Sequence, residues 1–406
     1  MDRQKEFDRS YLVLILEINK HIDGYIDAYI GPAQLKQEID AQPSRSPDRL
    51  LEDVRILLAS IPAEDKTRHA YLKALLRAVE TTILELGGEE IPYMEEVQRF
   101  YDIMPQRVGE EQFLQAHSEL DTFLPGSGSL ASRYQAWRKR YTVPQESLLS
   151  ALKLVQQEVR QRTAKLIDFP TGETVEYKLV QDQPWSAYNW FKGQGRSLIE
   201  FNTDIPVSAL GLVSLFAHEG YPGHHTEGVL KEQKYWLGQG YGEAAAMLLH
   251  SPAAVIAEGI AMTAVEIIFP RGEHIDWTVD ILLPAIQLDV QETAEQFLGV
   301  EKAMLQLRSV SGNAAISYHT GQISKEQAIE YYQTYGLATF ERAEKSFSFI
   351  THPLFRSYIF TYTEGYDLIS KAAAGKDKTD VFLSCLNKQK LPSQLAAQEA
   401  KLARGS

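Results

Sequence analysis

The chain has 406 residues, of which 44% are hydrophobic, 10% aromatic and 23% charged, as in a globular protein with a large core. These proportions argue against disordered, collagen-like and membrane-spanning classes, and no run of 18 apolar residues occurs. Acidic residues outnumber basic ones, 54 to 41, which gives a net charge of −13. We therefore expect neither nucleic acid nor a membrane surface as a partner, because both require a basic footprint.

The single cysteine, Cys385, excludes an internal disulfide and a cysteine-based zinc site. The first residues, MDRQKEFDRSY, lack the apolar segment of a signal peptide, so we expect a cytoplasmic protein. Nothing in the sequence indicates the oligomeric state.

The first 165 residues have the apolar spacing of helices. The pattern is clearest in 143–167, and weaker versions occur at 50–61, 66–86 and 92–103. The residues from 1 to 167 are therefore predicted to form an N-terminal helical region.

Between 168 and 203 the pattern changes to that of strands. Residues 174–180 alternate between apolar and polar, and 197–202 form a second candidate strand, reached through Gly193-Gln194-Gly195. These segments predict a small antiparallel sheet. A helix is then expected to start at Pro206, capped by Thr203 or Asp204, and the chain reads as helical from there to its end.

The predicted fold is therefore mainly α, with a small β element before the next helix. We divide the chain into 1–167 and a metal-binding catalytic region, 168–406. The boundary is soft, and one continuous body is the alternative.

Three of the ten histidines fall within eight residues, His218 to His225, in the order H-E-G-Y-P-G-H-H. The segment begins like the zinc-peptidase motif H-E-x-x-H, whose histidines bind zinc from one helix face. Here Pro222 occupies the fifth position, and His224 would lie about 9 Å up a straight helix. Because Pro222 clashes with the carbonyl of His218 and Gly223 is flexible, we expect a kink or bulge that returns His224 toward His218.

A third zinc ligand is expected downstream. Glu258 stands alone in the apolar stretch 252–266, where a charge is costly unless it is paired or binds a metal. A structural salt bridge is the alternative. Glu266 is better placed to support a ligand histidine, and Glu243 and His250 are weaker candidate ligands.

Glu219 follows the first histidine, where it can take a proton from the zinc-bound water. Peptide hydrolysis also needs a donor for the tetrahedral oxyanion, and Tyr318 or His319, just before Gly321, is the candidate. Imidazole and carboxylate ligands suit Zn²⁺ best, although Mn, Co or Ni can occupy such a site.

The H-E-x-x-P-G-H-H segment resembles the motif of the bacterial family named domain of unknown function 885. Phe201-Asn202, Glu258-Gly259 with Ala261, Tyr318-x-x-Gly321 and the segment Gly24 to Pro32 occur in the same order as in that family. Family members often carry aromatic residues where this chain has Ile260 and Thr263, and their second glutamate comes one position before Glu266.

This resemblance implies a helical, zincin-like fold related to metallopeptidases of the thimet oligopeptidase and thermostable carboxypeptidase kind. Carried over by position, it implies His218 and His224 as zinc ligands, Glu219 as the catalytic carboxylate and Glu258 as the third ligand. His225 is the alternative ligand or a donor to substrate.

We therefore expect a zinc-dependent hydrolase of peptide bonds, of the oligopeptidase or carboxypeptidase type. The strands within 173–202 would offer an edge for an extended peptide, and Arg308 or Arg356 would bind a terminal carboxylate. Two alternatives remain open: a zinc-dependent amidase or other small-molecule hydrolase, and a non-catalytic helical metal-binding protein. The presence of Glu219 argues against the last one, because a structural site needs no acid beside its first ligand.

Overall fold

The computed structural model describes residues 2–183, 185–374 and 377–397, and the chain is mainly helical, as predicted. The helices of the first part are α1 (Asp2–Asn19), α2 (Ala33–Asp40), α3 (Pro47–Ala59), α4 (Lys66–Leu86), α5 (Tyr93–Tyr101), α6 (Glu110–Phe123), α7 (Leu130–Arg140) and α8 (Leu148–Thr163). The prediction for 66–86 coincides with α4. The helix predicted over 143–167 is shorter, since a 3₁₀ turn over Gln145–Ser147 precedes α8.

The second part continues with α9 (Ala209–Glu219), α10 (His224–Lys231), α11 (Pro252–Ile268), α12 (Glu273–Trp277), α13 (Leu283–Ala285), α14 (Ala294–Gln306), α15 (Val310–His319), α16 (Lys325–Gly336), α17 (Phe340–Thr351), α18 (Ile359–Ala372) and α19 (Lys378–Asn387). The start expected for α9 at Pro206 is wrong by three residues. Ser208 pairs with Thr142 in an antiparallel bridge, which keeps the chain extended until Ala209.

A three-stranded sheet precedes α9, with the order β2-β4-β3 for β2 (Thr174–Val180), β3 (Ala187–Gly193) and β4 (Arg196–Asn202). Both predicted strands exist, but the antiparallel sheet is a wrong prediction: β2 and β4 are parallel neighbours. The unpredicted strand β3 runs back between them in sequence and pairs antiparallel with β4 at the edge. The chain reverses its direction between β2 and β3 and again between β3 and β4, so β4 runs parallel to β2.

A second, two-stranded sheet joins distant parts of the chain. β1 (Ile26–Tyr29) pairs antiparallel with β5 (Ala246–Leu248), so that the segment from Gly24 to Pro32 lies beside the residues that lead into α11. β1 also lies next to β3. This arrangement carries the N-terminal segment into the centre of the molecule.

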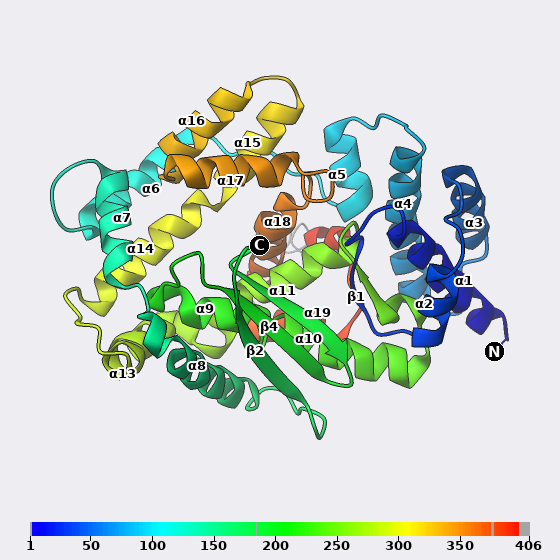
Figure 1. Ribbon diagram of the computed structural model, residues 1–406, viewed down its shortest axis with the longest axis horizontal. Helices are drawn as coiled ribbons and strands as arrows, with labels where there is room; N and C mark the ends of the chain where they lie inside the picture. Colours follow the sequence, from blue (N-terminus) through cyan, green and yellow to red (C-terminus); the bar gives the residue numbers. More distant parts are fainter. Residues whose placement is uncertain (1, 184, 375–376, 398–406) are drawn as a thin grey trace.

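Figure 1 shows α1–α4 at one end of the molecule, α6, α7 and α14–α17 at the other, and α9, α10, α11 and the strands between them. The buried apolar residues form two clusters. The smaller one belongs to α1–α4 with a few residues around β5, and the larger one extends from Ala78 to Leu395. Since the larger cluster draws on residues from both sides of position 168, the core does not divide at the predicted boundary.

Within the described residues, no single helix is both long enough and apolar enough to cross a membrane. Only the bent pair Pro252–Ile268 and Pro270–Ala285 together would meet the requirement, by length and composition alone. Of this pair, α11 is buried along nearly its whole length.

Candidate metal centre

The H-E-G-Y-P-G-H-H segment forms two helices with a break between them. α9 ends at Glu219, and α10 begins at His224. A Cβ atom on Gly223 would lie 1.9 Å from the carbonyl oxygen of His218, so only glycine allows the chain to pass this close to the end of α9. The expected interruption at Pro222 and Gly223 is present as a full break in the helix.

The break brings His218 and His224 together. Their ring centroids are 4.7 Å apart and nearly perpendicular. His218 lies in the last turn of α9 and His224 in the first turn of α10, so each comes from a rigid element. Together with Glu219 they present ligand atoms that all lie within 4.8 Å of one another.

Glu258 lies opposite these imidazoles, in the middle of α11. Its Oε2 is 3.4 Å from Nε2 of His218, and its Oε1 is 3.7 Å from Nε2 of His224. The side chain of Glu258 is only 5% exposed, whereas those of His218 and His224 are 17% and 23% exposed. Solvent therefore reaches the cluster from the side of the two imidazoles, and the carboxylate of Glu258 lies on its buried side.

The position of Glu258 depends on a close crossing of α11 and α18. A Cβ atom on Gly259 would lie 2.5 Å from the carbonyl oxygen of Gly365, and one on Gly365 would lie 2.4 Å from that of Val255. The two backbones therefore touch. This contact sets Tyr358 beside α11, where its hydroxyl donates a 2.7 Å hydrogen bond to Oε1 of Glu258.

This donor set fits a divalent cation. In a tetrahedral zinc site, ligand atoms at about 2.0–2.1 Å from the metal are separated by roughly 3.3 Å. The two distances from Glu258 to the histidines are close to this value, and the 3.9 Å between His218 Nε2 and Glu219 Oε1 is longer. By these distances Glu258 fits the place of a third ligand, and Glu219, whose ligand atom lies within 4.8 Å of those of both histidines, stands beside them as a second carboxylate.

The electrostatics of the cluster agree with this assignment. Burial lowers the pKa of both His218 and His224, which keeps them in the neutral form that binds metals. Burial raises the pKa of Glu258, and its Oε2 has no hydrogen-bond partner among the described residues. A cation bound at that oxygen would remove the penalty of burying it.

Glu219 is also buried, and its environment is acidic. Burial and the nearby charge of Asp27 raise the pKa of Glu219 to about 8. The amide of Asn189, in β3, donates to the backbone carbonyl of Glu219. A carboxyl group whose pKa lies near neutrality can both accept a proton and return it.

Two tyrosines of the C-terminal part complete the surroundings. Tyr362 follows Tyr358 by one helical turn, with ring centroids 5.6 Å apart. Burial raises the pKa of Tyr362, and so do the charges of Glu258, Glu219 and Asp27, so its hydroxyl stays protonated. Neither residue is predicted from the sequence, although tyrosines four positions apart fall on one face of a helix.

His225 has a different role from the one expected of an alternative ligand. It is fully buried and faces away from the cluster, with Nδ1 bonded to Ser197 Oγ at 2.8 Å and Nε2 to Glu173 Oε1 at 2.9 Å. Tyr221 and Arg160 also bind Glu173. With both ring nitrogens occupied, His225 anchors α10 to the sheet.

Tyr318 and His319, the expected oxyanion donors, are placed elsewhere. The ring of Tyr318 packs edge-on against Phe347, and His319 stacks on Tyr93 and donates from Nε2 to the carbonyl of Ile350. Among the described residues, no contact joins either one to the histidine cluster. The proposed pair therefore does not fit the role, because the end of α15 faces α5 and α17.

The weaker candidates are likewise occupied. Glu266 binds Tyr366 and Lys378 rather than a ligand histidine. Glu243 pairs with the buried Arg68, and His250 binds the carbonyl of Leu354 and stacks on Phe100. These three side chains therefore form ion pairs, hydrogen bonds and ring contacts away from the histidine cluster.

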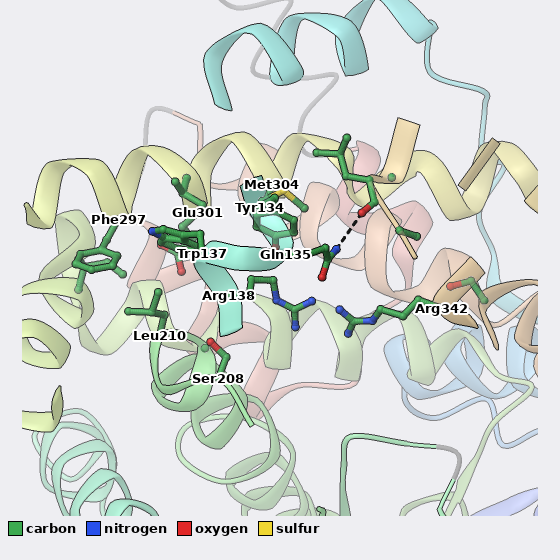
Figure 2. Close-up of a pocket in the computed structure, with 17 residues that line it drawn as sticks. Tyr134, Gln135, Trp137, Arg138, Ser208, Leu210, Phe297, Glu301, Met304 and Arg342 are labelled. Atoms are coloured by element: carbon green, nitrogen blue, oxygen red, sulfur yellow. Dashed lines mark hydrogen bonds between the residues drawn. The ribbon is translucent and has the colours of Figure 1, made fainter. Parts of the chain in front are cut away.

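A cavity of about 490 Å³ lies apart from this cluster, beside the first turn of α9 and between α7, α14 and α17. Figure 2 shows the guanidinium groups of Arg138 and Arg342 pointing toward one another there, with Trp137, Leu210 and Phe297 nearby. The cavity adjoins Ser208 at the start of α9, and His218 is in the last turn of that helix. The cavity is therefore not where the metal-ligating groups converge.

No family model and no curated protein matches the chain. Among solved structures, it is similar to a candidate lipoprotein from Colwellia psychrerythraea, with a TM-score of 0.51 and 16% identity over 95% of this chain and 69% of that one. It is also similar to a candidate lipoprotein of unknown function from Shewanella oneidensis, with a TM-score of 0.52 and 14% identity over 87% and 70% of the two chains.

A third similar structure is an M32 carboxypeptidase from Deinococcus radiodurans R1. Its TM-score is 0.38 at 11% identity, over 98% of this chain and 94% of that one, and a score this low supports no functional argument. The first two likenesses show that the fold exists elsewhere, and the chemistry has to be argued from the residues of this chain.

Proposed function

We propose that this protein is a zinc-dependent hydrolase of peptide bonds. The observation that carries the proposal is the convergence of His218, His224 and Glu258 at near-ligand distances, with Glu219 beside them. We also propose, from the order of the motifs, that the chain belongs with the family named domain of unknown function 885. Its substrate is a peptide or a small amide.

In this proposal His218, His224 and Glu258 hold the metal, and Tyr358 fixes the orientation of Glu258 through its hydrogen bond. Zinc, when bound, supplies a Lewis acid that polarises the substrate carbonyl and lowers the pKa of water. Glu219 takes a proton from the attacking water as the new carbon–oxygen bond forms. The same proton then passes from Glu219 to the leaving amine as the carbon–nitrogen bond breaks.

In this proposal Tyr362, whose ring centroid lies 5.6 Å from that of Tyr358, supplies the donor for the oxyanion. Its hydroxyl keeps its proton, because burial and three acidic neighbours raise its pKa. A fixed donor of this kind contributes about 10²–10³ in kcat in other hydrolases. This role replaces the one expected of Tyr318 or His319.

The proposal is tested by metal content and turnover measured on the same preparations. Elemental mass spectrometry on untagged protein should find one zinc per chain, lost in His218→Ala and Glu258→Ala and kept in His117→Ala, whose histidine binds the carbonyl of Tyr335 far from the cluster. Glu219→Gln should keep the zinc and lose hydrolysis of a peptide mixture by about 10²–10⁴. A wild-type protein that binds no zinc, or a Glu219→Gln variant with unchanged turnover, would refute the proposal.

A further inference from the structure

The cavity between α7, α9, α14 and α17 has a wall of buried apolar side chains. Phe297, Val300 and Met304 line it from α14, and their spacing of three and four positions puts them on one face of that helix. Trp137 of α7 and Leu210 of α9 complete the apolar part, and both are buried. Small organic ligands bind in cavities of about 300–1,000 Å³. The volume of about 490 Å³ therefore suits one small molecule.

Two arginines from different helices also line this cavity. Arg138 belongs to α7 and Arg342 to the first turn of α17, and Figure 2 shows their guanidinium groups pointing toward one another. In the part of the chain that the structure describes, neither side chain makes an ion pair or a hydrogen bond. Arg138 contacts only the ring of Tyr134, with 5.7 Å between its guanidinium carbon and the ring centroid.

The arginines expected from the sequence to bind a terminal carboxylate differ in this respect. Arg308 pairs with Asp367 at 2.5 Å, and Arg356 pairs with Glu96 at 2.5 Å and with Glu85 at 3.1 Å. Their charges are thus compensated within the protein, and an anion would have to displace a carboxylate to reach them.

The carboxylate that lines the cavity is bound to another residue. Both oxygens of Glu301 lie 2.9 Å from Nε2 of His274, and neither pairs with Arg138 or Arg342. The two guanidinium charges therefore repel each other without a counter-charge between them, and an anion placed there would turn this repulsion into two attractions.

The first turn of α9 adds to the positive potential of the cavity. Ser208, Leu210 and Gly211 line the wall, and the side chain of Ser208 does not cap the helix. The first N–H groups of a helix have no partner within it and carry a partial positive charge. The arginines and this helix end thus favour a ligand of the same sign.

We propose that this cavity binds a small organic anion, with a phosphate or carboxylate group between Arg138 and Arg342. The fork of a guanidinium donates two parallel hydrogen bonds to either group. The apolar body of the ligand packs against Trp137, Leu210 and Phe297. The site needs no metal and goes beyond the proposed function, since His218 lies about 15 Å farther along α9 than Ser208.

The test is calorimetric binding of hexyl phosphate, hexanoate and 1-hexanol to the full chain. At least one of the two anions should bind to a single site about tenfold or more tightly than 1-hexanol, and the tighter anion identifies the preferred head group. Inorganic phosphate and acetate should bind at least about tenfold more weakly than their hexyl counterparts, because they lack the apolar body. Phosphates and carboxylates also bind zinc, so the titrations are repeated with His218→Ala, in which the affinity should be unchanged.

Matched variants locate the binding. Arg138→Gln and Arg342→Gln should each lower the affinity at least about tenfold. Lys139→Gln and Lys345→Gln remove the same charge from exposed positions of the same two helices, outside the cavity, and should keep the affinity. Thermal unfolding of all four variants excludes loss of the fold as the cause.

Three results would overturn the proposal. The first is equal affinity for 1-hexanol and for both anions in the wild type, a comparison that needs no variant. The second is loss of binding in His218→Ala, which would assign the anion to the histidine cluster. The third is an equal loss of affinity in the arginine and lysine variants, which would assign the binding to net charge alone.

Discussion

The hydroxyl of Tyr358 donates a hydrogen bond to the carboxylate of Glu258, a residue that precedes it by a hundred positions. The bond exists because Gly259 and Gly365 let the backbones of α11 and α18 touch. The proposed metal ligand is thus oriented by the residue that precedes α18, far along the chain.

Tyr358→Phe should weaken zinc binding by about 10- to 100-fold, the usual effect of removing a hydrogen bond to a ligand. Tyr362→Phe, in the first turn of α18, is the matched variant: zinc affinity should stay the same while kcat falls by about 10²–10³. Competition with a chromogenic chelator measures the affinity, and peptide turnover measures kcat. If both variants behaved alike, the separate roles of the two tyrosines would be refuted.

Gly223→Ala should prevent the two histidines from meeting, since the added Cβ would overlap the carbonyl of His218. We expect loss of stoichiometric zinc and a lower melting temperature. Gly211→Ala, in the same helix as His218, meets nothing nearer than 4.0 Å and should keep the metal, with a gain of about 0.5–1 kcal/mol in stability. Zinc retained in Gly223→Ala would show that the break tolerates a side chain.

Removal of the buried cation Arg68 should destabilise the folded protein. Arg68 binds both Asp8 and Glu243 with its side chain only 3% exposed, so Arg68→Ala leaves two buried carboxylates without a cation. We expect a loss of about 3–5 kcal/mol in the free energy of unfolding. Arg49, which pairs with Glu52 at 69% exposure, is the control, and its alanine variant should change stability by less than about 1 kcal/mol.

Acid should destabilise the protein through His250. Burial lowers the pKa of His250 from 6.5 to about 4, so between these values the unfolded chain binds a proton that the folded chain does not. The contribution is present above pH 6.5 and is lost as the pH falls toward 4. From pH 7 to pH 5 the loss is roughly 2 kcal/mol. Urea unfolding at both pH values should show a smaller difference in His250→Gln, and an equal difference would assign the effect to other groups.

Part of the site could be predicted because its signals are local. His218, Glu219 and His224 fall in one short segment, and Glu258 is a lone carboxylate in an apolar helix, where burial alone demands a partner. The remaining residues depend on tertiary packing. Tyr358 acquires its role only through the crossing of α11 and α18.

The errors have the same origin. The local sequence predicts Tyr318 and His319 as oxyanion donors, but the end of α15 faces Tyr93 and Phe347. The direction of β4 relative to β2 depends on β3, which lies between them in sequence. In β3 apolar and polar residues do not alternate regularly, as they do in a typical half-buried strand, so the sequence does not indicate it. A single chain segment does not contain the information needed to decide either case.

The long sequence interval between Glu258 and Tyr358 has a consequence for biosynthesis. His218, His224 and Glu258 emerge from the ribosome well before α18 has been synthesised. At that stage the carboxylate of Glu258 is neither buried nor oriented by Tyr358. At the proposed zinc site, tight metal uptake would then wait until nearly the whole polypeptide has been synthesised and α18 has docked on α11. Incorporation of zinc would thereby mark the completed molecule and distinguish it from truncated translation products.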